Sequence, residues 1–519
     1  MNDKITRIHT AFLGFAKRAE KVSSDILSHT FVDTEPLTTI LGTRNNQILY
    51  GRRGTGKTHA LLYLAELVRG QGESAIYLDL RSIGSDGSIY NDLSRSLAER
   101  SVRLVLDVLK AIGNELYGIA VERIASSDYP DQLTLRLDDL ESSFSEVRIV
   151  GDTTAEEKQT STSSASKSFG GSLVGALSTV TGTISASSNV SAGEERQTGR
   201  TTSGREQFSL HFGRVQSALR SLLEVLGNPR IWVLIDEWSE IPVDLQPLLA
   251  DLLRRTLLPI DNFIVKIAAI EHRSSFFLPK GRGEYVGFEL GADISTDLNL
   301  DDFLVFDNDQ GKSVDFFKRL LFRHLKASEA GPEFSSPEEM VQIAFTQAPA
   351  FDELVRAAEG VPRDALNLAA KVATKSFGKA VSITDVRAAA RDWYQQDKAA
   401  SVQASTQLYK ALEYIIGEVI GNRRARAFLL KANTRNEVID RLFDYRVVHL
   451  LKKNISSRDD PGQRYDAFKI DYGCYVELIN TQKATEGLFA LDDGGHTDVP
   501  LDDYRSIRRA ILNVEELPS

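Results

Sequence analysis

The stretch QILYGRRGTGKTHALLYLAELVRG at residues 47–70 decides the fold of this chain. It begins with a short apolar run, passes through a glycine-rich turn and ends in apolar residues at helical spacing, so we expect a strand, a loop and a helix in succession. Further apolar β-type runs lie at 74–82, 231–235 and 263–270, and residues 243–258 have a helical pattern. Strands that alternate with helices favour an α/β fold with a parallel sheet covered on both faces.

The glycine-rich turn GRRGTGKT at 51–58 matches the pattern G-x-x-x-x-G-K-S/T in its required place between strand and helix. Its glycines let the backbone N–H groups point inward at phosphate oxygens, and the dipole of the following helix adds to that attraction. Lys57 is expected to contact the β- and γ-phosphates, and Thr58 to ligate Mg²⁺. The sequence therefore predicts a site for ATP and Mg²⁺. The candidate binding residues are Gly51, Arg52, Arg53, Gly54, Thr55, Gly56, Lys57, Thr58 and His59.

A second motif, IWVLIDEWSE at 231–240, is an apolar strand with two carboxylates at its end. Asp236 is expected to bind the Mg²⁺ shell, and Glu237 to polarise the attacking water as a general base. The alternative is that both acids only cap the next helix. The phosphate loop upstream favours the catalytic interpretation.

The strand at 263–270 ends in the polar residues Glu271, His272, Arg273 and Ser274. These side chains should lie at the carboxyl edge of the sheet, where ligands bind in open α/β folds. Arg273 is our first candidate for a residue that senses the γ-phosphate, and His272 is the second. The alternative is a solvated turn without a role in binding.

Together these motifs resemble the AAA+ ATPases of the origin-recognition and archaeal-initiator clade, which are related to the STAND ATPases. The resemblance rests on GRRGTGKTHAL (51–61), VLIDEWSEIP (233–242), the polar end of the next strand, and AEGVPRDALNLAAKVA (358–373). It implies a P-loop NTPase core of AAA+ type with a helical lid, a C-terminal winged helix and Mg²⁺-dependent ATP hydrolysis.

The resemblance also implies roles for residues outside the two main motifs. In this family a Gly-x-x-Arg or Gly-x-Pro sequence in the lid places a sensor group over the nucleotide, and Gly360, Pro362 and Arg363 fit both versions. The segment HTFVDTEP at 29–36 resembles the lead-in that packs near the adenine. The leading candidate for an arginine finger, which reaches a neighbouring subunit's γ-phosphate, is Arg282; Arg254 and Arg255 follow it.

The pattern along the chain predicts four parts. They are an N-terminal helix (1–30), an ATPase core (31–305), a helical lid (306–400) and a winged-helix-like domain (401–519). The core contains two insertions, a helical one at 88–145 and one rich in Ser, Thr and Gly at 150–206. The second insertion is either a surface segment or one that orders against a partner or within a ring through Leu173, Leu177, Val180 and Ile184. A membrane-inserting hairpin is a third, less favoured alternative.

The C-terminal part leaves the question of nucleic acid open. Residues 404–420 and 434–446 are expected to be helices, and 447–456 and 464–478 to be β-like runs that form a wing. Between the helices, NRRARAF carries three arginines that are candidates for contact with double-stranded DNA. They are Arg423, Arg424 and Arg426. Acidic residues on the second helix argue for a protein-docking role instead, because phosphate contacts favour uncompensated positive charge.

Composition narrows the remaining possibilities. The 519 residues are 42% hydrophobic and 26% charged with a net charge of −10, which argues against a surface that coats nucleic acid or an anionic membrane. A single cysteine, Cys474, excludes a disulfide framework and a cysteine-based zinc site, which fits a reducing cytoplasm. Nowhere do eighteen apolar residues run together, so we expect no stable membrane insertion.

The sequence therefore predicts an ATP-hydrolysing AAA+- or STAND-like switch whose nucleotide state controls a protein partner or self-association. The alternatives are an ATP-gated DNA-binding initiator or loader, and an ATPase that regulates an effector in stress response or phage defence.

Overall fold

The structure is a computed structural model of the chain, and most of the polypeptide falls into two compact units. Residues 1–87, 229–254 and 261–519 form the first unit, and residues 88–228 and 255–260 form the second. The residues described are 2–16, 22–34, 36–83, 88–124, 130–144, 147–150, 153–155, 200–202, 205–208, 211–281, 283–302, 309–423, 425, 427–432, 434, 436–456, 462–481 and 511–518.

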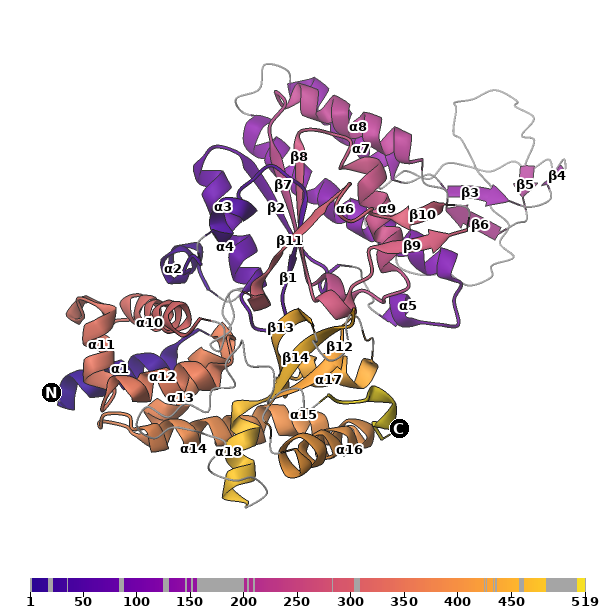
Figure 1. Ribbon diagram of the computed structural model, residues 1–519. Coiled ribbons are helices and arrows are strands. Elements are labelled where there is room, and N and C mark those ends of the chain that lie inside the picture. Colours follow the sequence, from indigo (N-terminus) through magenta and orange to yellow (C-terminus); the bar gives the residue numbers. More distant parts are fainter. Residues whose placement is uncertain are drawn as a thin grey trace. The chain divides into compact units, whose positions relative to one another are not determined.

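A five-stranded parallel sheet is the centre of the first unit (Figure 1). Its strand order is β11-β1-β8-β7-β2, so β8 separates the strand before the phosphate loop from the strand that carries Asp236. Every residue of β7 and β8 is buried, as the continuous apolar runs predict. The α/β fold with a parallel sheet is therefore confirmed. The strands are β1 (Gln47–Tyr50), β2 (Ser74–Asp79), β7 (Ile231–Asp236), β8 (Phe263–Ala269) and β11 (Ser295–Asn299).

Helix α4 (Lys57–Gly70) follows the phosphate loop and covers one face of this sheet. Its buried residues Leu61 and Leu64 belong to the same core as Trp232 of β7 and Ile264 of β8. The helical spacing of apolar residues in the sequence thus becomes the face that packs on the sheet.

The N-terminal helix α1 (Asn2–Gly14) shares one hydrophobic core with five helices that follow the sheet and with Tyr472 and Val476 of the later helix α18 (Tyr472–Asn480). Ile8 and Phe12 of this helix α1 are fully buried among residues of the later bundle. The bundle consists of α10 (Gln310–Lys326), α11 (Pro337–Ala344), α12 (Ala348–Ala358), α13 (Pro362–Lys375) and α14 (Ile383–Trp393).

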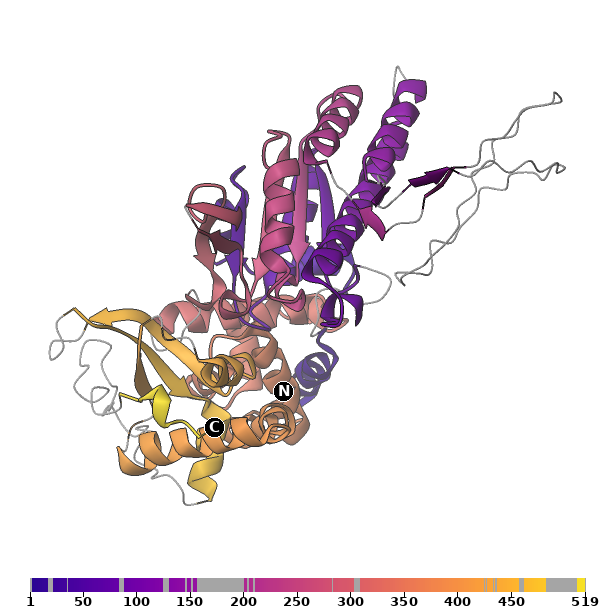
Figure 2. The ribbon, with the colours of Figure 1, turned by 90° about the vertical axis from the view of Figure 1, so that its right-hand side faces the viewer.

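The C-terminal module combines three helices with an antiparallel sheet of strand order β12-β14-β13. Figure 2 shows its gold strands lying over the orange helix α16, with which they share a core. The expected β-like run at 464–478 is wrong in its second half, because Asp471 accepts a hydrogen bond from the backbone N–H of Cys474 and so starts a helix. The elements are α16 (Thr406–Ile415), β12 (Ala427–Lys431), α17 (Glu437–Asp444), β13 (Val448–Ser456), β14 (Arg464–Ile470) and α18 (Tyr472–Asn480).

The second unit contains the helical insertion. Helix α7 packs against both α6 and α8 through buried leucines such as Leu133 and Leu140. Two short antiparallel strand pairs, β3 with β6 and β4 with β5, follow α7. Leu173, Leu177, Val180 and Ile184 lie outside the described residues. The helices are α5 (Ser88–Asn91), α6 (Leu97–Ile124), α7 (Pro130–Ser143) and α8 (Phe212–Val225), and the strands are β3 (Val147–Val150), β4 (Thr153–Ala155), β5 (Arg200–Thr202) and β6 (Arg205–Phe208).

A hairpin of β9 (Phe277–Lys280) and β10 (Glu284–Gly287), which the sequence pattern does not indicate, follows β8. Within the described ranges, no helix combines the length and apolar character that crossing a bilayer requires.

The shared core of α1 and the bundle predicts a large effect of truncating Phe12, whose side chain is completely buried. Phe12→Ala is expected to lower the free energy of unfolding by about 3–5 kcal/mol, because it removes apolar contacts and leaves a cavity. Chemical denaturation followed by circular dichroism measures this loss. Leu13→Ala is the matched control, since Leu13 is 45% exposed on the same helix. Equal effects of the two changes would contradict the shared core.

Candidate functional site

A cavity of about 370 Å³ lies where the phosphate loop, the N-terminal segment and the helical bundle of the first unit meet. Its wall combines glycines and charged residues with apolar residues and two histidines. It is lined by Ala16, Val22, Leu27, Thr30, Arg53, Gly54, Gly56, Lys57, Thr58, His59, Arg81, Glu237, Glu240, Leu320, His324, Pro362, Arg363 and Leu366.

The phosphate loop needs glycine at position 54 for two reasons. Gly54 has φ +89°, a left-handed conformation that side chains disfavour. A Cβ atom there would also lie 3.0 Å from Cγ1 of Val361 and 3.1 Å from Cβ of Arg363. The backbone N–H of Arg363 donates a hydrogen bond to the carbonyl of Gly54 at 3.2 Å. The start of α13 therefore closes directly onto the loop.

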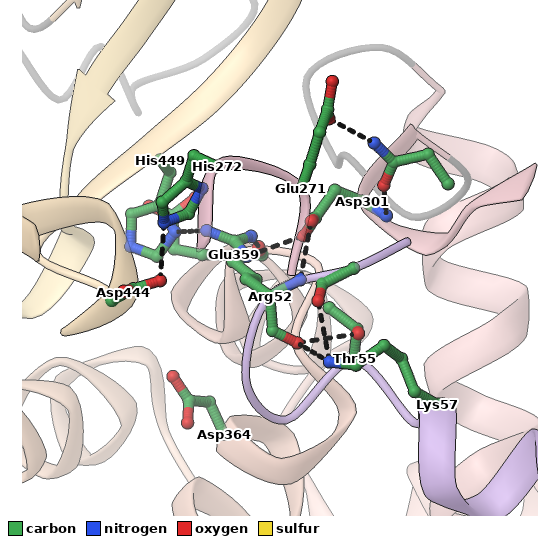
Figure 3. Close-up of polar contacts among 12 residues, drawn as sticks. Arg52, Thr55, Lys57, Glu271, His272, Asp301, Glu359, Asp364, Asp444 and His449 are labelled. Carbon is green, nitrogen blue, oxygen red and sulfur yellow. Dashed lines mark hydrogen bonds and ion pairs between the residues drawn. The ribbon is translucent and has the colours of Figure 1, made fainter. Parts of the chain in front are cut away.

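Lys57 extends back along the loop (Figure 3). Its Nζ donates to the carbonyl oxygens of Gly51 at 2.7 Å and Arg52 at 3.1 Å. Burial lowers the pKa of Lys57, while the carboxylates of Asp236, Glu237 and others oppose that shift. A buried ammonium held only by neutral carbonyls on the loop gains a stronger partner when a phosphate enters the cavity.

The two predicted magnesium ligands lie side by side. The hydroxyl of Thr58 donates to Oδ2 of Asp236 at 2.6 Å, and the hydroxyl of Tyr77 donates to the same oxygen at 2.8 Å. Such a pair of hard oxygens fits Mg²⁺, which takes few protein ligands and completes its octahedron with phosphate oxygens and water. Across the described ranges, no group of three or more His, Cys, Asp and Glu could hold a metal by itself.

Glu237 has the environment of a general base. Burial raises the pKa of its carboxyl, and Asp236 adds to the rise, while Lys57 and Arg81 oppose it. A carboxylate with a raised pKa accepts a proton more readily. Glu237 also has φ +56°, an uncommon conformation for a residue with a side chain, and it is located at the end of β7 where its carboxyl lines the cavity.

Arg81 is a site residue that sequence reasoning missed. Its Nη1 lies 3.5 Å from Oε1 of Glu237, and its Nε and Nη2 donate to the carboxylate of Asp79. Asp79 pairs with Asp236 in the register of β2 and β7, so the neighbouring strand end presents Arg81 to the base. Its position two residues after a buried strand was the available signal, because the carboxyl ends of parallel strands meet at one edge.

The cavity wall also contains apolar residues, including Leu27, Leu320 and Leu366, which suit contact with a nucleobase. His59 Nε2 lies 2.9 Å from the carbonyl of Leu27, and His324 Nδ1 lies 2.9 Å from the carbonyl of Leu320. Burial lowers the pKa of His59, and it lowers the pKa of His324 to about 4. Both rings are therefore neutral at pH 7. The sequence gives no sign that His324 is a site residue. It lies in the last turn of α10, where basic residues are common because they interact favourably with the helix end.

Other predicted residues divide into those that line the cavity and those that face elsewhere. Pro362 and Arg363 line it, as does Arg53, which pairs with Glu240 at 2.7 Å. The hydroxyl of Thr55 donates to the carbonyl of Arg52 at 2.9 Å, inside the loop. The Arg52 side chain is not among the lining residues.

The predicted sensors His272 and Arg273 lie beside Asp444 of α17. His272 Nε2 is 2.8 Å from Oδ1 of Asp444, and Arg273 Nε is 3.7 Å from its Oδ2. Neither residue is among those that line the cavity. In this conformation the turn after β8 contacts the C-terminal module.

The remaining arginine candidates have the following surroundings. Arg254 pairs with Asp251 at 2.6 Å, and the guanidinium of Arg255 lies over the ring of Phe212 at 5.4 Å. Arg423 donates to the carbonyl of Ile511 at 2.6 Å and lies near Glu418. Arg282, Arg424 and Arg426 lie outside the described residues.

Comparison with known proteins supports the resemblance drawn from the motifs. Residues 15–83, which contain the phosphate loop and α4, match the family model described as ORC-CDC6-like. This match supports an AAA+ ATPase type of the origin-recognition clade. A search of the curated proteins found no match to the chain.

His324 predicts a pH dependence of stability. Its pKa is about 4 in the folded chain and about 6.5 when unfolded, so below pH 6.5 the unfolded state takes up a proton that the folded state refuses. Stability therefore falls as the pH drops from about 6.5 towards 4. Between pH 7 and 5 we expect His324→Gln to lose about 2 kcal/mol less unfolding free energy than the wild type. Denaturant titrations at both pH values measure this, and parallel losses would contradict it.

Proposed function

Starting from the match to the ORC-CDC6-like family, we propose that this chain binds ATP with Mg²⁺ and hydrolyses it as a molecular switch. One observation carries the proposal. Lys57, Thr58 and Glu237 line one cavity, Thr58 is hydrogen-bonded to Asp236 behind it, and the apolar part of the cavity wall suits a base. Phosphate binding, metal binding and water activation are the three functions that phosphoryl transfer to water needs.

In the proposed reaction, the loop N–H groups and the side chains of Lys57 and Arg363 bind the triphosphate. Bound Mg²⁺, held by Thr58 and Asp236, would neutralise charge on the phosphate oxygens. Glu237 takes a proton from a water molecule whose oxygen attacks the γ-phosphorus, and the bond to the ADP oxygen breaks. Arg81 keeps the base in place through its contacts with Glu237 and Asp79.

The switch that we propose passes through the lid and the turn after β8. Arg363 lines the cavity at the start of α13, so a γ-phosphate in the cavity would act on the lid directly. His272 and Arg273 contact α17, so a shift of this turn would reach the C-terminal module. A protein partner or a second copy of the chain would then read the change, and a neighbouring copy could supply an arginine finger.

The proposed chemistry makes separate predictions for Glu237 and Lys57. Glu237→Gln should keep ATP binding but slow hydrolysis about 10²–10⁴-fold, because the amide cannot accept the proton. Lys57→Ala should weaken ATP binding itself, because its ammonium is lost. Calorimetric titration with Mg²⁺-ATP and a phosphate-release assay distinguish the two effects. Glu66→Gln, on the exposed face of α4, is the control. Unchanged hydrolysis in Glu237→Gln, or no ATP binding by the wild type, would contradict the proposal.

A second candidate function is ATP-gated DNA binding. The order helix, strand, helix and two paired strands in the C-terminal module favours a winged helix, which is a frequent DNA-binding module. The docking of α17 beside His272 argues that this helix would have to leave the core before it could enter a groove.

DNA binding predicts that a combined change of Arg423, Arg424 and Arg426 to glutamate weakens duplex binding and flattens its salt dependence. Each lost phosphate contact should reduce the slope of log K against log salt by about one. Fluorescence anisotropy with a labelled duplex at several salt concentrations measures the slope. Arg136→Glu, a charge reversal on α7 in the second unit, is the control. Affinity that is insensitive to salt and to these changes would exclude this function.

A further inference from the structure

Arg52, the second residue of the phosphate loop, is only 3% exposed and is not among the residues that line the cavity, and its side chain extends toward Asp301 and His449 (Figure 3). Its Nε lies 2.9 Å from Oδ1 of Asp301, and its Nη2 donates to the carbonyl of Glu359 at 2.6 Å. Its Nη1 contacts Nδ1 of His449 on β13, and its guanidinium lies over the ring of Phe443 at 5.3 Å. A residue of the nucleotide loop thus contacts the sheet edge, the lid and the C-terminal module.

The backbone of the same residue helps to hold the loop. Its N–H donates to Oδ2 of Asp301 at 2.8 Å. Its carbonyl accepts hydrogen bonds from the Thr55 hydroxyl at 2.9 Å and from Lys57 Nζ at 3.1 Å. When Lys57 turns towards a phosphate, it gives up its hydrogen bond to the carbonyl of Arg52. The side chain of the same Arg52 contacts the C-terminal module. Nucleotide binding and docking of the C-terminal module therefore both change the contacts of Arg52.

The ring of His449 is suited to receive Arg52 because it is neutral. Burial, with Arg52 next to it, lowers the pKa of His449 well below its ordinary value. A neutral ring has one nitrogen that accepts and one that donates. Nδ1 faces the Arg52 guanidinium and so accepts, which leaves Nε2–H to donate to Oδ2 of Asp471 at 3.1 Å. One tautomer satisfies both contacts.

Buried ion pairs continue this chain of contacts back to the lid. Lys398 pairs with Asp471 and, at 3.2 Å, with Asp364, which directly follows the cavity-lining Arg363. Arg446 also pairs with Asp364, and Lys469 pairs with Glu359. Separating the C-terminal module would leave these charges without partners, which is costly in a dry interface. The interface is therefore expected to form or open as a whole.

We propose that Arg52 is a positioning residue through which the C-terminal module holds the phosphate loop, so that nucleotide affinity depends on the docking of this module. The inference rests on the proposed ATP binding and adds a determinant outside the cavity. It assigns His449, which touches no cavity atom, a part in nucleotide affinity. By reciprocity, nucleotide must stabilise the docked module by the same factor.

The test compares Arg52→Met, His449→Phe and the double variant by calorimetric titration with Mg²⁺-ATP. His449→Phe keeps a ring but removes the acceptor, and it should weaken binding about five-fold or more. Arg52→Met should weaken binding by a similar factor. The double variant should bind ATP as tightly as the single variant with the lower affinity, because both changes break the same Arg52–His449 contact. Arg441→Met, an exposed arginine on α17, is the matched control. Thermal melting checks that each variant is folded.

A second measurement separates positioning from a purely structural role. Hydrogen exchange at β13 and α17 should slow when ATP binds the wild type, and this protection should be lost in His449→Phe at saturating ATP. Wild-type affinity in a folded His449→Phe, strictly additive losses, or exchange that ignores ATP would each overturn the inference. A wild type that binds no ATP would instead remove the proposed function itself.

Discussion

The phosphate loop depends on partners for the carbonyl groups that it turns outward. Pointing successive N–H groups into the cavity leaves these carbonyls to be satisfied elsewhere, since buried backbone groups need hydrogen bonds. The helical bundle supplies the N–H of Arg363, which donates a hydrogen bond to the carbonyl of Gly54. Lys57 of the loop itself donates to the carbonyls of Gly51 and Arg52. Asp301, just after the edge strand β11, holds both the backbone and the guanidinium of Arg52. These contacts hold the loop in shape, which lowers the cost of ordering it around a ligand.

Much of the core could be predicted because its signals are local. QILY, IWVLI and FIVKIAAI are continuous apolar runs, and all three are strands of the parallel sheet. The motif around Lys57 also indicates Thr58 and Asp236 as neighbours, and these two side chains do form a hydrogen bond. Such agreement is expected where a strand is buried on both faces, because burial then dictates apolar residues at every position.

The features that the sequence did not predict have a common cause: their conformation depends on contacts with residues far away in the sequence. Strand β11 has the sequence STDLN, whose mixed pattern becomes a strand only because β1 pairs with it along one edge. His324 lines the site from the last turn of α10, whose sequence gives no hint of a ligand, and Arg81 has only its place after a buried strand as a signal. Arg52 was expected at the phosphates, but an arginine in this motif can turn to either side of the loop. Here the acceptors behind the loop, above all Asp301, decide its direction.

The neutral, fully buried His449 has a further consequence for how this chain can be divided. A boundary near residue 400 looks natural in the sequence, because helices of the bundle end there and a different pattern begins. Cutting the chain at that point would remove the acceptor for Arg52 together with Lys469, the partner of Glu359. In the shortened protein, Arg52 and Glu359 would lie on a surface that is buried in the intact chain. Any loss of nucleotide binding in the shortened protein would then reflect these newly exposed, unpaired groups. It would not describe the ATPase core as an independent domain.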